Sequence, residues 1–123
     1  MSYDVATRKE HNYLHATITG ENSEATVRRY FEQLAREAAQ AKCRRLLIEE
    51  RLEGPRLDSQ SVFRIAAEGS PKFRGVFRKI AFVDVYAEDH SMKNAEAVAS
   101  NRGLPVRIFN TVAEADEWLQ APG

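Results

Sequence analysis

Acidic side chains and one histidine follow two apolar segments of the sequence, Leu46–Ile48 and Ile80–Val83. Carboxylates beside a histidine can exchange protons in acid–base catalysis, or can hold a metal as a two-carboxylate, one-histidine set. In open α/β sheets, ligands bind beyond the carboxyl ends of the parallel strands, which is where these residues would lie. We therefore identify five candidates for a ligand pocket: Glu49, Glu50, Asp84, Tyr86 and His90.

The same residues also have a purely structural interpretation. Glu88 and Asp89 stand where a helix would begin, and acids there interact favourably with the helix dipole. Arg51 can neutralise Glu49 or Glu50. The sequence contains no His-Glu-x-x-His motif, phosphate-binding loop or nucleophile elbow. We accordingly predict a protein that is not an enzyme, with no catalytic residue, no metal and no cofactor.

The segment before the second apolar run interleaves cations with phenylalanines. Such a mixture can bind anions, lipid headgroups or an acidic partner, because aromatic rings insert while cations hold phosphates. In the alternative interpretation, Phe77 begins a buried strand and the cations are solvated. The candidates for an anion or lipid surface are Lys72, Phe73, Arg74, Arg78 and Lys79.

Three further residues can ligate metals or react covalently. His11 and His15 flank the second predicted strand, and their spacing places them too far apart to share a metal closely, so we expect both at the surface. Cys43 is the single cysteine, which excludes an internal disulfide. Neighbouring cations could make it reactive, but without a cysteine-enzyme signature we favour a small packing residue.

Composition limits the class of protein. The 123 residues carry 18 Lys and Arg and 18 Asp and Glu, so the formal net charge is zero. A balanced charge argues against a dedicated nucleic-acid binder. The length predicts a single domain spanning residues 1–123. With no apolar run long enough to span a bilayer and no signal peptide, we expect a cytoplasmic protein.

Hydrophobic periodicity gives the elements that must position these residues. It predicts an α/β fold, with a mixed five-stranded sheet and four helices in the order ββαβαβαβα, and only the first strand antiparallel. Ile80–Val83 is predicted at the centre of the sheet, and Pro105 favours an edge position for the last strand. The predicted strands are 3–9, 13–19, 46–48, 80–83 and 104–109; the predicted helices are 23–42, 58–68, 88–102 and the closing helix that ends at Leu119.

The closing strand and helix, residues 106–119, are the most informative part of the chain. Thr111 stands at an N-cap position with Glu114 three residues later, as in a capping box. Ala115, Trp118 and Leu119 follow at i, i+3 and i+4, which makes one apolar stripe. We expect this stripe to dock on the sheet.

Two segments resemble the STAS-like family that is described as similar to the sporulation anti-sigma-factor antagonist (SpoIIAA-like). They are the closing strand and helix, and Leu46–Glu49 followed by Leu57–Ser61. The resemblance implies a non-catalytic regulatory module that binds a protein partner near Asp58, Ser59 and Ser61. Gln60 stands where the family carries its phosphorylated hydroxyl, so the usual phosphoswitch is absent at that position; Ser59 or Ser61 could serve instead, or Asp58 and Ser59 only cap a helix.

Two other functions and a dimer stay open at this point. STAS-like domains are also likened to the lipid-binding Sec14 fold, which would make this protein a carrier of a small apolar or lipid-like ligand. An enzyme or metal protein would need Glu49, Glu50, Asp84 and His90 to converge. A homodimer could form through an edge strand or through the exposed face of the second helix.

Overall fold

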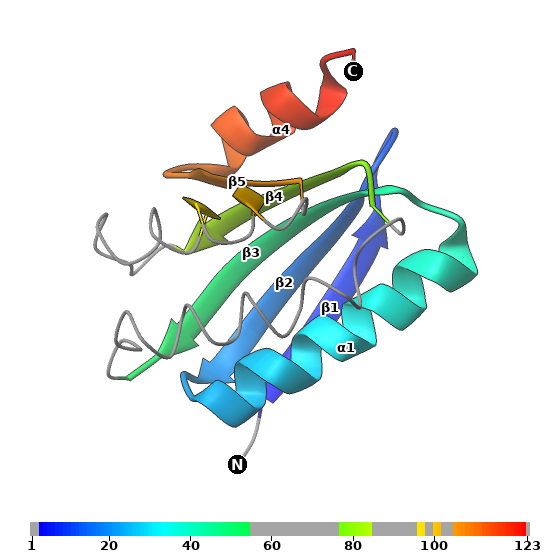
Figure 1. The fold of residues 1–123 in the computed structure, drawn as a ribbon. Coiled ribbons are helices and arrows are strands. Elements are labelled where there is room, and N and C mark those ends of the chain that lie inside the picture. The colour runs from blue at the N-terminus through cyan, green and yellow to red at the C-terminus, as the bar shows by residue number, and fades with distance from the viewer. Residues whose placement is uncertain (1–2, 55–76, 85–95, 98–99, 102–104, 123) are drawn as a thin grey trace.

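A five-stranded mixed sheet forms the centre of the protein (Figure 1). The computed structural model describes residues 3–54, 77–84, 96–97, 100–101 and 105–122. The strands lie in the order β1-β2-β3-β4-β5; β1 pairs antiparallel with β2, and every later neighbour is parallel, as predicted. Their bounds are β1 (Tyr3–Lys9), β2 (Leu14–Glu21), β3 (Arg45–Glu53), β4 (Lys79–Asp84) and β5 (Val106–Phe109).

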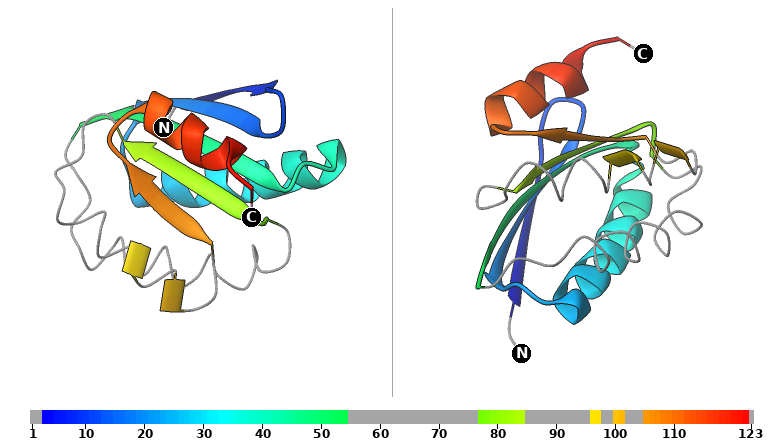
Figure 2. Two further views of the ribbon diagram at one scale, coloured as in Figure 1. Left: turned by 90° about the horizontal axis from the view of Figure 1, so that it is seen from above. Right: turned by 60° about the vertical axis from the view of Figure 1, so that its left-hand side comes forward.

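Helices α1 (Glu24–Ala41) and α4 (Val112–Gln120) cover opposite faces of the sheet (Figures 1 and 2). Of the four predicted helices, these are the two that the described residues contain in full. Residues 96–97 and 100–101 are helical and fall within the third predicted helix. The helix predicted for 58–68 lies outside the described residues.

Each face of the sheet has its own apolar core. Side chains of β2 that alternate along the strand, Leu14, Ala16 and Ile18, pack against the buried stripe of α1. On the other face, Leu47, Ala81 and Val83 pack against α4. Because β3 faces a helix on both sides, Leu46, Leu47 and Ile48 are all fully buried, as their continuous apolar run predicted.

The central strand is β3, and the prediction that Ile80–Val83 would lie at the centre is wrong by one position. β3 is also longer than predicted, because it continues through Glu49, Glu50 and Arg51. A run of polar residues is expected to end a buried strand. Here the two glutamates are buried and hydrogen-bonded, so the strand continues.

The closing helix α4 begins and docks as its sequence predicts. The Thr111 hydroxyl accepts a hydrogen bond from the Glu114 N–H at 3.2 Å and donates to the Glu114 carboxylate at 3.0 Å. Half of the predicted capping box is therefore confirmed, whereas the Glu114 carboxylate binds the Thr111 hydroxyl and not the Thr111 backbone N–H. Ala115 and Leu119 are fully buried against the sheet, and Trp118 is half-buried beside them.

Replacing Thr111 with alanine is expected to lower the free energy of unfolding by about 1 kcal/mol, because the Glu114 N–H loses its partner at the helix start. Urea denaturation measures this change. Thr111→Ser keeps the hydroxyl and should stay near the wild type. Equal losses for both variants would show that the cap does not stabilise α4.

Candidate functional site

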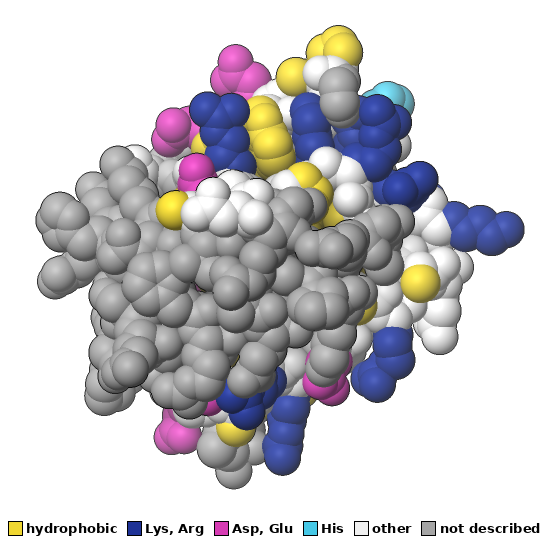
Figure 3. Space-filling model, viewed as in Figure 1, with side chains coloured by type: hydrophobic (Ala, Val, Ile, Leu, Met, Phe, Trp, Pro, Cys, Tyr) yellow, Lys and Arg dark blue, Asp and Glu magenta, His cyan; other side chains and the backbone are white. Residues whose placement is uncertain are grey.

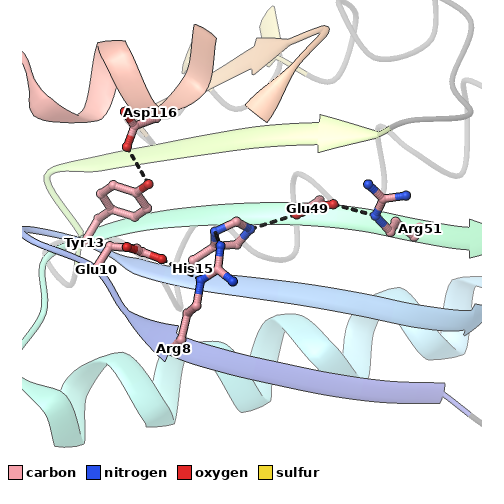
Figure 4. Close-up of polar contacts among 7 residues, drawn as sticks. All are labelled: Arg8, Glu10, Tyr13, His15, Glu49, Arg51 and Asp116. Carbon is pink, nitrogen blue, oxygen red and sulfur yellow. Dashed lines mark hydrogen bonds and ion pairs between the residues drawn. The ribbon is translucent and has the colours of Figure 1, made fainter. Parts of the chain in front are cut away.

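Four polar side chains form a continuous chain across the α4 side of the sheet (Figure 4). Arg8 of β1 contacts His15 of β2, His15 contacts Glu49 of β3, and Glu49 contacts Arg51. The three separations are 3.2 Å from Arg8 Nη2 to His15 Nδ1, 2.8 Å from His15 Nε2 to Glu49 Oε1, and 2.5 Å from Arg51 Nε to Glu49 Oε2. We call these four residues the polar chain.

Strand register explains why these four side chains meet. Arg8 lies directly opposite His15 in the antiparallel pair of β1 and β2. Glu49 of β3 lies opposite Thr17 of β2. Thr17 is two residues after His15 and shares its face of the sheet, because alternate residues of a strand point to the same side. Helix α4 packs chiefly on β3, β4 and β5, and it contacts β1 and β2 less. The polar chain therefore runs from β3 towards the two strands that α4 contacts least.

The hydrogen bonds of His15 define its tautomer. An arginine side chain can only donate, so the contact from Arg8 requires a lone pair on Nδ1. The ring proton then resides on Nε2, which donates to Glu49. His15 is buried, with 4% of its surface exposed, which contradicts the prediction that it lies at the surface; His11, in the turn before β2, is exposed as predicted. The ring connects β1 on one side with β3 on the other.

Glu49 is ionised in spite of its burial. Burial alone raises the pKa of the carboxyl group, but the hydrogen bonds from Arg51 and His15 lower it by more, so the pKa of Glu49 lies below its ordinary value. Both carboxylate oxygens are occupied by these partners. The group is thus a structural anion held between two donors.

Tyr13 links the same face to α4. Its hydroxyl donates to Asp116 Oδ1 at 2.6 Å, on the same face of the sheet as the polar chain (Figure 4). Burial, together with the hydrogen bond and the charge of Asp116, raises the pKa of the Tyr13 phenol well above its ordinary value. The phenol stays protonated and joins the residue before β2 to the helix.

Glu49 and Glu50 do not converge. Neighbouring residues of a strand point to opposite faces, and Glu50 accepts a hydrogen bond from the Tyr30 hydroxyl of α1 on the other side of the sheet. Both residues lie within β3, so the expectation that they follow their strand is wrong. The side chain of Asp84, and all of Tyr86 and His90, lie outside the described residues. Within the described ranges, no three His, Cys, Asp or Glu side chains are grouped to hold a metal.

Lys79 is a structural cation and does not belong to an exposed surface. It is 8% exposed, and its Nζ donates to the carbonyl oxygens of Trp118 at 2.8 Å and Ala121 at 2.9 Å, while lying 5.0 Å from the Trp118 ring centre. Arg45 also donates to the Leu119 carbonyl oxygen. These two cations thus bind the carbonyl oxygens at the C-terminal end of α4, where the helix dipole is negative.

The other residues of the predicted anion surface divide into two groups. Arg78 is exposed. On the face that Figure 3 shows, lysine and arginine side chains gather at the upper right. Lys72, Phe73 and Arg74 lie outside the described residues. Phe77 is buried in the α1-side core, as the alternative interpretation predicted.

Cys43 and the Asp58–Ser61 segment complete the predicted candidates. Cys43 is buried in the core, where its thiol donates to the Arg45 carbonyl oxygen at 3.3 Å, in agreement with a packing role. Asp58, Ser59, Gln60 and Ser61 lie outside the described residues. The sequence interpretation missed the polar chain, because its residues on β1, β2 and β3 meet only through the register of the strands.

Comparisons with known proteins identify the fold. No family model matches the sequence, and no curated protein matches it. Among the residues described, no helix is long and apolar enough to cross a membrane. A solved structure from Shewanella loihica PV-4, an uncharacterized DUF3478-family protein with a SpoIIAA-like fold, aligns over 95% of this chain and 93% of its own, with a TM-score of 0.50 and 16% sequence identity. The chain therefore has a SpoIIAA-like fold, as the resemblance of its two segments predicted.

Proposed function

We propose that this domain is a non-catalytic interaction module that binds an acidic segment of a protein partner. The observation that carries the proposal is the use of its buried ionisable side chains. Glu49, Glu50 and Lys79 each hold an internal hydrogen bond that joins two elements of the fold. Groups used in this way stabilise a scaffold, and they are not poised to transfer protons to a substrate.

The binding surface that we propose lies at the β3 end of the polar chain. The Arg51 side chain is 47% exposed, and its Nε donates to the Glu49 carboxylate (Figure 4). Thr19, directly opposite Arg51 on β2, is exposed. A guanidinium held at its Nε is oriented in advance, and its outer edge can bind a carboxylate in a bidentate manner.

Asp58, Ser59 and Ser61 enter the proposal through the family resemblance alone, which implies partner binding near them. A phosphoswitch at Gln60 is not included, since glutamine has no hydroxyl. Phosphorylation of Ser59 or Ser61 would add negative charge to this segment and would oppose binding of an acidic partner.

Charge reversal at Arg51 is expected to weaken capture of the partner. Immobilised wild-type protein, the Arg51→Glu variant and the Arg107→Glu variant would each be exposed to lysate of the source organism, and bound proteins would be quantified by mass spectrometry. Arg107 is the matched control, because it is an exposed arginine on β5. A partner retained by wild type and Arg107→Glu, but reduced about tenfold with Arg51→Glu, would support the proposal.

Two results would count against this function. Capture that is equal for all three baits would exclude Arg51 from the binding surface. Turnover of a small molecule by the purified protein, without any captured partner, would show that the domain is an enzyme.

A further inference from the structure

The two edges of the sheet differ in how they are protected. At β5, a strand of four residues preceded by Pro105, the Ile108 N–H donates to the Glu96 carboxylate at 2.7 Å. At β1, seven residues pair with β2 in an unbroken register without a bulge or a proline. Across the described part of the chain, only β2 pairs with β1 (Figure 1). A long, regular edge strand of this kind is a template for pairing with another strand.

The sequence of β1 is complementary to itself in antiparallel orientation. If a two-fold axis passes beside Ala6, Asp4 of each copy lies opposite Arg8 of the other, which gives two pairs of opposite charge on one face. The small Ala6 side chains meet at the axis, and on the other face Val5 lies opposite Thr7. Asp4, Ala6, Thr7 and Arg8 are all exposed in the single chain.

Apolar side chains beside this edge would gain burial from pairing. Tyr3 and Val5 of β1 and Phe31 of α1 are half-buried, and all three pack against the α1-side core. A second sheet edge placed against β1 would cover the remaining surface of these side chains in both copies. Apolar burial would then add to the backbone hydrogen bonds of the paired strands.

We propose that two copies of this chain associate through β1, pairing antiparallel about Ala6 into one continuous ten-strand sheet. The interface is isologous, because each copy contributes the same strand. Arg8 connects this interface to the polar chain, since the residue that would face Asp4 of the second copy also contacts His15 and pairs with Glu10 of its own chain. Arg51 lies on β3, two strands away from the edge, so the partner surface stays accessible in the dimer.

Charge reversal with rescue tests the interface by sedimentation equilibrium. Asp4→Lys alone, or Arg8→Glu alone, places like charges opposite each other twice, and we expect the dimer dissociation constant to rise about tenfold or more. The double variant restores opposite charges and should return to within about threefold of wild type. Arg107→Glu, on the other edge strand, should leave the constant unchanged.

Cysteine cross-linking tests the register. In the proposed pairing Ala6 faces its own copy, so Ala6→Cys should form a covalent dimer rapidly with copper–phenanthroline as the oxidant. Asp4→Cys faces Arg8 of the other copy and should cross-link slowly; Cys43 is buried and does not compete. A wild-type protein that stays monomeric up to the millimolar range, a dimer insensitive to the single charge reversals, or equal cross-linking at positions 4 and 6 would each overturn the proposal. None of these results bears on capture of a partner through Arg51, which is tested separately.

Discussion

Leu119→Ala is expected to lower the free energy of unfolding by about 2–5 kcal/mol, the largest loss of the changes considered. Leu119 is fully buried and belongs to the α4-side core. It lies in the last turn of α4, next to the carbonyl groups that Lys79 and Arg45 bind. The substitution removes three carbon atoms of the side chain and would leave a cavity between the helix and the sheet. It would also loosen the hydrogen bonds from Lys79 and Arg45 to the end of the helix.

Urea denaturation with an unchanged m-value measures this loss. Glu117→Ala is the matched control, because Glu117 is exposed on the same helix turn and its replacement should change stability by no more than about 0.5 kcal/mol. If Leu119→Ala costs no more than Glu117→Ala, then α4 does not pack on the sheet as described.

Glu49→Leu is expected to lower the free energy of unfolding by about 1–3 kcal/mol. The carboxylate is the shared acceptor for His15 and Arg51, and leucine cannot replace it. Arg51 is partly exposed and can bind water instead, whereas His15 is buried and would keep an unsatisfied N–H. The loss therefore arises chiefly at His15. Glu53→Leu, at an exposed position of the same strand, should have a small effect.

The stabilising effect of Glu49 also depends on pH. Its folded-state pKa is below the ordinary value of 4.5, so the unfolded chain binds the proton more readily. The stabilisation is complete above about pH 4.5 and is lost as the pH falls through the lower folded-state pKa. Urea midpoints between pH 3 and 6 should fall less steeply on acidification for Glu49→Gln than for wild type. Parallel curves would show that Glu49 is not held as an anion.

The parts of the fold that the sequence predicts well depend on local signals. The bounds of β1 and α1 and the cap at Thr111 follow from hydrophobic periodicity and from capping residues, which act within a few residues of the chain. The parallel pairing follows from helices inserted between strands. Which strand lies at the centre depends on the order of strands in space, and a local pattern does not contain that order.

The candidate site was harder to predict, because its residues are far apart in the sequence. Arg8, His15 and Glu49 become neighbours only through the register of β1 with β2 and of β2 with β3. Glu49 was recognised from its residue type, and its pairing with Arg51 was one of the two pairings predicted. Its second partner, His15, could not be predicted. Lys79 shows the opposite error: its basic neighbours suggested an exposed cation, whereas the C-terminal carbonyl groups of a helix more than thirty residues away bind it.

Arginine side-chain NMR provides the most direct test of the proposed interaction surface. The Nε–H resonances of Arg8, Arg51 and Arg107 would be followed while the partner recovered by capture is added to nitrogen-15-labelled protein. We expect the Arg51 resonance to shift in proportion to the bound fraction, while that of Arg107 stays in place. Saturation by the partner with shifts at Arg107 and an unchanged Arg51 resonance would contradict the assignment of this surface.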